Sequence, residues 1–107
     1  MRGPFVLTKY YVDMVVPHNR LGVFALSNAR DGFDVLVRSE KNACDEIKTY
    51  FSQYKYFWIR PASSPRDAFA IECEVYHSRM AQRCNGNGNG HPKAPEASGW
   101  HCPVCGK

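Results

Sequence analysis

The chain has 107 residues, which is enough for one small domain and too few for two of ordinary size. Hydrophobic residues make up 44% of it, so a packed core is expected and disorder throughout is excluded. The formal charge of +4 is compatible with a polyanionic partner but far below that of a histone-like tail.

Two features of the sequence bear on location. No window holds the ~18 apolar residues that a membrane span requires, so no membrane partner is expected. The first residues lack the apolar run and cleavage site of a signal peptide, which predicts a cytoplasmic protein. In that reducing compartment the five cysteines are expected to be metal ligands and spare thiols, not disulfides.

Residues 1–20 are predicted to form an N-terminal strand or arm. The segment FVLTKYYVDMVV, residues 5–16, is rich in β-branched and aromatic residues and stops at Pro17. Such a segment could be an edge strand that is open to pairing with another chain.

Residues 21–80 are predicted to form the core of the fold, which begins with an antiparallel hairpin. The apolar runs LGVFALS (21–27) and FDVLVRS (33–39) are the two strands of this hairpin. The intervening NARDG contains Asn, Asp and Gly, the residue types that favour a tight turn.

Two helices and a further strand follow the hairpin. Asn42 can cap a helix over NACDEIKTYFSQY, where apolar residues recur at helical spacing. KYFWIRP, residues 55–61, is strongly β-forming. Ser64 as cap and Pro65 at the first helical position begin the last helix, SSPRDAFAIECEVYHSRM. These elements predict an α+β fold, a small antiparallel β-sheet with two main helices.

Residues 81–107 form a tail that is too poor in hydrophobic residues to fold unaided. It contains CPVCG at 102–106, in which two cysteines are separated by two residues and followed by glycine. This pattern is typical of a knuckle that supplies two ligands to a tetrahedral zinc, since the glycine permits the tight turn around the sulfurs. A structural site needs two ligands more.

The last helix can supply the two missing ligands. Cys73 and His77 are four residues apart and therefore lie on one helical face. The predicted site is a structural Zn²⁺ held by Cys73, His77, Cys102 and Cys105. Such a zinc would fasten the tail to the helix.

Alternatives to this ligand set remain open. His91 or His101 could replace His77 as the histidine ligand, and Cys84 could replace Cys73. A redox role for the two knuckle cysteines is less favoured, because redox pairs usually open a helix after a strand. The remaining cysteine, Cys44, is expected to be a small buried residue.

The order of elements over residues 21 to about 80 resembles that of the GIY-YIG nuclease domain. The order is strand, turn, strand, helix, strand and a helix that contains AFAIE. The tail resembles that of small family members with a Cys/His motif, through His91, Pro92, Pro95, Trp100 and the knuckle. In this family, two tyrosines, an arginine and a glutamate that binds Mg²⁺ or Mn²⁺ hydrolyse phosphodiesters.

The catalytic motifs of the family are degenerate in this chain. Phe24 and Val35 stand where the two tyrosines are expected, and Glu46 stands where the arginine is expected. The metal-binding glutamate is matched by Glu72, although a glutamate there could equally be an ordinary solvated charge. The resemblance implies a nuclease-like fold without nuclease activity, and Mg²⁺ is expected only if the chain is active.

Three functions follow from these features. The first is nucleic-acid binding through the vestigial nuclease groove. The candidate residues are cations and aromatic residues: Arg38, Lys41, Lys48, Lys55, Tyr56, Trp58 and Arg60. Tyr56 and Trp58 would share one face of a strand, where they either pack in the core or stack on bases. The second function is a small protein-interaction subunit that docks on a larger complex, and the third is an active metal-dependent endonuclease.

Overall fold

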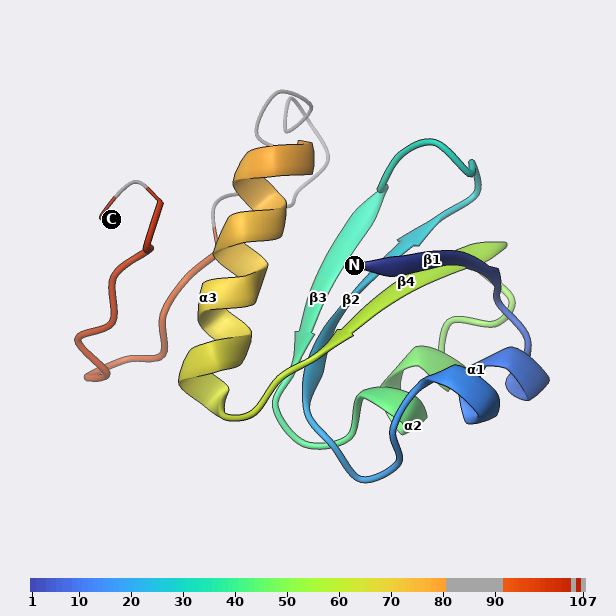
Figure 1. Ribbon diagram of the computed structural model, residues 1–107, viewed down its shortest axis with the longest axis horizontal. Coiled ribbons are helices and arrows are strands. Elements are labelled where there is room, and N and C mark those ends of the chain that lie inside the picture. The colour runs from blue at the N-terminus through green and yellow to red at the C-terminus, as the bar shows by residue number, and fades with distance from the viewer. Residues whose placement is uncertain (81–91, 105, 107) are drawn as a thin grey trace.

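A four-stranded antiparallel sheet forms the centre of the described part of the chain, in the order β1-β4-β2-β3 (Figure 1). The computed structural model describes residues 1–80, 92–104 and 106. The strands are β1 (Arg2–Val6), β2 (Gly22–Ser27), β3 (Val35–Ser39) and β4 (Tyr56–Pro61). Strand β2 is central and pairs with both β3 and β4. This is the antiparallel α+β architecture that the sequence predicts.

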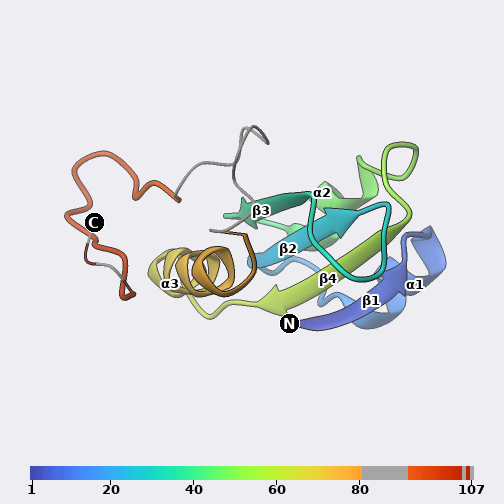
Figure 2. The same ribbon diagram turned by 90° about the horizontal axis from the view of Figure 1, so that it is seen from above.

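Helices cover both faces of the sheet (Figure 2). On one face lie α1 (Lys9–Val15) and α2 (Ala43–Lys48). On the other lies α3 (Pro65–Val75), which continues as a short π-helical turn, Tyr76–Met80. The described part of the tail, 92–104, runs along the side of α3 that faces away from the sheet (Figures 1 and 2). The fold therefore contains a helix, α1, in addition to the two main helices that the sequence predicts.

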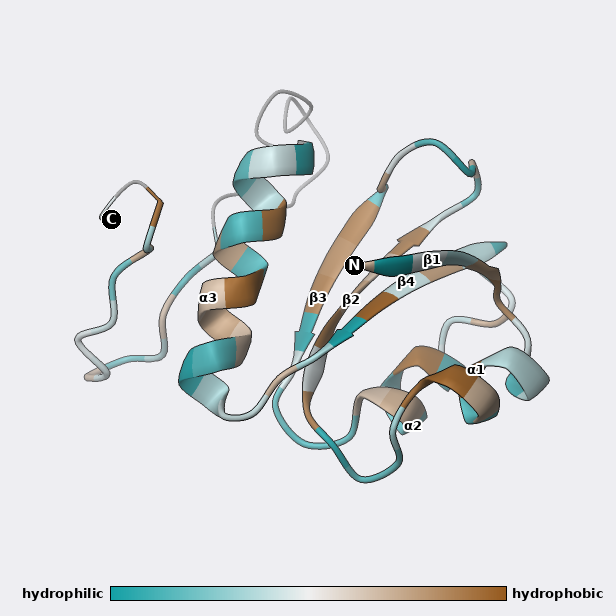
Figure 3. Cartoon of the chain, in the orientation of Figure 1, coloured by the Kyte–Doolittle hydropathy of each residue, from teal (hydrophilic) through white to brown (hydrophobic). Residues whose placement is uncertain are grey.

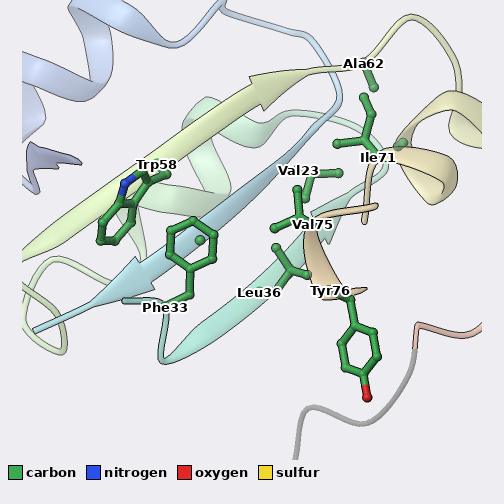
Figure 4. Packing of buried hydrophobic residues seen from close by; sticks show 10 residues of the cluster. Val23, Phe33, Leu36, Trp58, Ala62, Ile71, Val75 and Tyr76 are labelled. Carbon is green, nitrogen blue, oxygen red and sulfur yellow. The ribbon is translucent and has the colours of Figure 1, made fainter. Parts of the chain in front are cut away.

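Alternation along the strands divides the core into two layers. On β2, Val23 and Ala25 pack against α3, whereas Phe24 and Leu26 pack against α1 and α2. Figure 4 shows the α3 layer, which also contains Trp58. The strands carry mainly hydrophobic residues, while the turn between β2 and β3 is hydrophilic (Figure 3). Both faces of the sheet are therefore buried, as is usual when helices lie on each side.

The N-terminal segment differs from the extended arm predicted for residues 1–20. Strand β1 does lie at the edge of the sheet, where it pairs with β4. The chain then forms α1, although its composition favours a strand. Thr8 caps this helix, because its Oγ1 accepts a hydrogen bond from the Tyr11 N–H at 3.3 Å, and Val12 is fully buried. Burial of the apolar side of α1 outweighs the local β-propensity.

The elements predicted for residues 21–80 are present. Asn42 and Ser64 cap α2 and α3, each accepting a hydrogen bond from an N–H three residues on. The predicted helix from Asn42 is shorter than expected and ends at Lys48. The Thr49 hydroxyl donates to the Glu46 carbonyl at 2.7 Å at this end, and the chain turns before β4.

Candidate functional site

An open hollow of about 520 Å³ lies where β3 ends and α2 begins. Its lining consists of Arg38, Ser39, Glu40, Lys41, Asn42, Asp45, Glu46 and Thr49. This is the groove that the family resemblance places at a nuclease centre, because Glu46 occupies the arginine position. Three carboxylates line it against two cations, so it has no excess of positive charge to attract a phosphate.

The positions matched to the catalytic tyrosines carry no hydroxyl and belong to the packed interior. Phe24 is fully buried on the α1–α2 side, and its ring centroid lies 6.0 Å from that of Tyr50. Val35 is half-buried and packs against the same cluster. Neither side chain can exchange a proton with a nucleophile, so this part of a hydrolytic site is missing.

Glu72, the carboxylate matched to the metal ligand of the family, forms an ion pair with Arg38. Nη1 of Arg38 lies 2.9 Å from Oε1 of Glu72, and the two side chains are only 15% and 14% exposed. These two atoms are not aligned as a hydrogen bond, so their attraction is mainly electrostatic. The positive charge of Arg38 opposes the binding of a divalent cation at Glu72.

Arg38 makes further contacts that hold it in place. Its Nη2 donates a hydrogen bond to the Lys93 carbonyl oxygen at 2.9 Å, which ties β3 to the tail. Its guanidinium lies 5.3 Å from the ring centroid of Phe69, and its Nε lies 3.6 Å from a carboxylate oxygen of Glu40. Arg38 was predicted to bind nucleic acid, but these internal contacts already engage its side chain.

The two aromatic residues predicted to stack on bases lie on the face of the sheet towards α3. Trp58 is buried, and its ring centroid lies 4.6 Å from that of Phe33 (Figure 4). Tyr56 is half-buried, with the guanidinium of Arg30 5.4 Å from its ring centroid. The side chain of Trp58 belongs to the core, which leaves only part of Tyr56 open to solvent.

The predicted cations lie at separate places in the fold. Lys41 is exposed beside the acidic groove, and Lys55 is exposed just before β4. Arg60 lies near the end of the same strand, with Nη1 3.3 Å from a carboxylate oxygen of Glu74 on α3. Lys41 thus shares the acidic groove with Arg38, whereas Lys55 and Arg60 lie elsewhere, at the two ends of β4.

A second hollow, of about 300 Å³, lies on the α3 side of the sheet. It is lined by Met1, Phe33, Arg60, Glu74, Val75, Ser78 and Arg79. Arg79 extends over Phe33, with its guanidinium 5.2 Å from the ring centroid. Two arginines face one carboxylate here, so this hollow has the excess of positive charge that the groove lacks.

Two arginines of this face were not predicted to bind nucleic acid. Arg30 lies in the turn between β2 and β3, and Arg79 lies in the turn that follows α3. No local sequence pattern indicates that these two arginines lie on the same side of the sheet. We call Arg30, Arg60 and Arg79 the arginine surface.

Two of the four predicted zinc ligands lie in one buried cluster. Cys73 and Cys102 pack with Phe69, and the half-buried Trp100 covers them. The exposed fractions of Cys73 on α3 and Cys102 in the tail are 0% and 2%, although most of the described tail residues are exposed or half-buried. The structure thus places Cys102, the first cysteine of the predicted knuckle, against the helix face that carries Cys73.

The backbone around Cys102 turns tightly. The Val104 N–H donates to the Cys102 sulfur at 3.4 Å, and the Gly106 N–H donates to the Cys102 carbonyl oxygen at 2.8 Å. A knuckle points backbone N–H groups at its sulfurs in this way. His77 is half-buried one turn after Cys73.

The other predicted or alternative ligands are placed less fully. His101 is exposed beside Cys102. Cys105, His91 and Cys84 lie outside the described residues.

A different set of metal-binding side chains meets between α1 and α2. Asp13, His18 and Cys44 each offer one ligand atom, and these atoms all lie within 4.8 Å of one another. This cluster could hold a metal ion. Cys44 is buried, as expected from the sequence, but its two neighbours in this cluster were not predicted. They come from segments that only the packing of α1 on α2 brings together.

The pKa values of Asp13, Cys44 and the neighbouring Lys48 are shifted from their ordinary values. The ammonium of Lys48 forms an ion pair with Asp13 and holds the pKa of that carboxyl below its usual range. The same contact raises the pKa of Lys48. Burial raises the pKa of the Cys44 thiol, so without a metal this cysteine is a protonated and unreactive group at neutral pH.

Comparisons with known proteins add no relative to these observations. No protein-family model, no curated protein and no solved structure matches the chain. Within the described residues, none of the helices has the length and apolar character needed to cross a membrane.

Proposed function

We propose that the chain is a catalytically inactive, zinc-stabilised module with a GIY-YIG-like fold that binds nucleic acid. The observation that carries this proposal is the arginine surface on the α3 side of the sheet. Strands and helices from β2 to α3 follow each other in the order on which the family resemblance rests. The binding surface proposed here is not the nuclease groove, which is acidic.

The loss of activity rests on three positions. Phe24 provides no hydroxyl, Glu46 places a negative charge where a phosphate would need a positive one, and Arg38 neutralises Glu72. Loss of one donor that stabilises charge in a transition state costs about 3–4 kcal/mol, and a reversed charge costs more. Together these changes remove the groups that hydrolysis of a phosphodiester requires.

Binding rests on the chemistry of arginine. Its planar guanidinium can donate two parallel hydrogen bonds to a phosphate, and it stacks on aromatic rings. Arg30 and Arg79 are each held over a ring, Tyr56 and Phe33 respectively, which limits the conformational entropy that binding would cost. Contacts of this kind follow the backbone of the nucleic acid and carry little sequence information.

The zinc has a structural part in this proposal. Cys73, His77, Cys102 and Cys105 would hold Zn²⁺ and join the tail to α3. The shared burial of Cys73 and Cys102, together with the tight turn at Cys102, supports this ligand set. The tail in turn positions Lys93 against Arg38, so the zinc would also stabilise the Arg38–Glu72 ion pair.

The test is a titration of labelled single-stranded and duplex DNA and RNA with zinc-loaded protein, followed by fluorescence anisotropy. The variant Arg60→Gln/Arg79→Gln is expected to weaken binding about tenfold or more, because it removes two phosphate contacts. Lys9→Gln/Arg66→Gln removes the same charge from exposed positions elsewhere, on α1 and at the start of α3, and serves as the matched control.

One further variant separates charge at this surface from structure. Glu74→Gln removes the one carboxylate among the described residues that line the second hollow and frees Arg60, so it is expected to strengthen binding. Equal weakening by the two double variants, or no effect of Glu74→Gln, would contradict the proposal.

A second function, docking on a protein partner, is favoured by a different observation. Val6, Tyr10 and Met14 are 45%, 70% and 57% exposed around α1, and the last two lie one helical turn apart. Such exposed apolar residues are typical of interaction surfaces. This function predicts no affinity for any nucleic acid. It also predicts a discrete heteromeric product when a photocrosslinker replaces Tyr10, with a lower yield after Met14→Ser.

A further inference from the structure

The cluster between α1 and α2 has the dimensions of a metal site. The Cys44 sulfur lies 3.8 Å from Oδ1 of Asp13, and Nε2 of His18 lies 3.9 Å from the same oxygen. Ligands of a tetrahedral zinc lie about 2.0–2.3 Å from the metal, and therefore about 3.5 Å from one another. Only small movements of the three side chains are needed to reach that geometry.

The three residues are held by different parts of the fold. Asp13 lies in the second half of α1, His18 lies in the loop after this helix, and Cys44 lies in the first turn of α2. Val12, next to Asp13, and Ala43, next to Cys44, are both core residues. Two of the three ligands are therefore anchored on packed helices.

One side of the cluster is buried and the other faces solvent. Cys44 is 1% exposed, whereas the side chain of His18 is 61% exposed. A metal could approach from the side of His18 and keep a water molecule as its fourth ligand. Three protein ligands and one open position are the arrangement of zinc sites that are not purely structural.

The cluster already attracts a cation. The ammonium of Lys48, one helical turn after Cys44, contacts Oδ1 of Asp13, the atom shared by both other pairs. Lysine has a long and flexible side chain, so it can rotate away when a divalent ion takes its place. Lys9 and Asp45 also contribute to the local field, with opposite signs.

The donor atoms restrict which ion would bind. A thiolate and an imidazole are poor ligands for Mg²⁺ and Ca²⁺ but good ligands for Zn²⁺ and for Co²⁺. Binding would release the thiol proton of Cys44 to solvent, since only the thiolate ligates a metal. We propose that Asp13, His18 and Cys44 form a second site for a zinc-type ion, which displaces Lys48 and links α1 to α2.

This site is independent of the proposed function and of the tail. The test is a titration of the metal-free chain with Co²⁺, followed by the thiolate-to-metal absorption band and by mass spectrometry under native conditions. Cys44→Ser and His18→Gln are each expected to bind one equivalent fewer than the unaltered chain. Cys102→Ser is the matched control: it is expected to lose the tail equivalent and to keep the α1–α2 equivalent, which is lost only when His18→Gln is added to it.

The variants His18→Gln and Lys48→Gln each have an outcome that would contradict the proposal. His18 is exposed, so His18→Gln is not expected to disturb folding, and an unchanged number of bound ions in this variant would overturn the proposal. Lys48→Gln removes the competing cation and is expected to lower the Kd of the α1–α2 site about fivefold. An unchanged Kd would show that Lys48 is not displaced.

Discussion

The ion pair between Arg38 and Glu72 links three parts of the molecule: β3, α3 and the tail. Both side chains are mostly buried, and Arg38 also bonds to the Lys93 carbonyl. When one member of a buried pair is removed, the other charge stays in a medium that solvates it poorly. Replacing one member of the pair is therefore expected to destabilise the fold more than replacing both members together.

Glu72→Gln is expected to lower the free energy of unfolding by about 2–3 kcal/mol, because it leaves Arg38 without its nearest counter-charge. Arg38→Met/Glu72→Leu is expected to cost less than the single change. Urea denaturation of zinc-loaded protein measures both, with the exposed Glu74→Gln as control. A loss of stability no greater than that of the control would show that the pair is not important for folding.

The pair of Asp13 and Lys48 is a surface contact whose contribution depends on pH. The folded pKa of Asp13 is lowered from its ordinary value of 3.8, so its contribution exists above that pH and is lost as the pH falls through the folded pKa. The folded pKa of Lys48 is raised from 10.5, so its contribution exists below that pH and is lost as the pH rises through the folded pKa.

A double-mutant cycle with Asp13→Asn and Lys48→Gln in metal-free protein is expected to give a constant coupling across the neutral range. The coupling should decline in strong acid, where Asp13 becomes protonated. A coupling that changed near neutral pH would contradict this prediction.

At the scale of elements, the strands and helices with strong local signals were predicted from the sequence. The turn NARDG, the cap Asn42 and the pair Ser64–Pro65 each define a boundary through local hydrogen bonding or backbone geometry. Helix α1 was missed because its β-branched and aromatic residues favour a strand locally. The Thr8 cap and the burial of Val12 against the other helix and the sheet stabilise the helical conformation instead.

The tail is the element whose placement is proposed to depend on zinc. Removal of the metal with a chelator is expected to release 92–104 from α3, since the tail contributes few residues to the core. Trp100 fluorescence should then shift towards that of a solvated indole, while far-UV circular dichroism stays nearly constant. Trp100→Phe identifies the signal, because the other tryptophan, Trp58, is buried in the core layer between the sheet and α3.

Simultaneous loss of the helical signal would contradict this prediction. It would mean that zinc stabilises the whole domain instead of its tail.

At the scale of the whole molecule, the distribution of charge differs between the two faces of the sheet. The hollow beside α2 contains more carboxylates than cations, whereas the hollow beside α3 contains more arginines. The formal charge of +4 predicts a polyanionic partner in general terms but cannot locate the surface. The location of this surface depends on the fold, which brings Arg30 and Arg79 to the same face of the sheet although they are far apart in the chain.

Sequence spacing predicted one part of the candidate sites, the approach of the tail to the last helix. Cys73 and Cys102 do lie in one buried cluster, while the full zinc ligand set stays a prediction. The cluster of Asp13 and Cys44 could not be foreseen in the same way. These residues belong to a helix that was not predicted, and their separation in the chain carries no signal.

The central claim, that this fold binds nucleic acid without cleaving it, is tested most directly by one measurement. Zinc-loaded protein is titrated against labelled single-stranded DNA at two or more salt concentrations with Mg²⁺ present, and each sample is then run on a denaturing gel. Three phosphate contacts predict that log K falls with log salt with a slope of about −2, and that the strand stays intact. Mg²⁺-dependent cleavage abolished by Glu72→Gln, or binding absent at every salt concentration, would contradict the account.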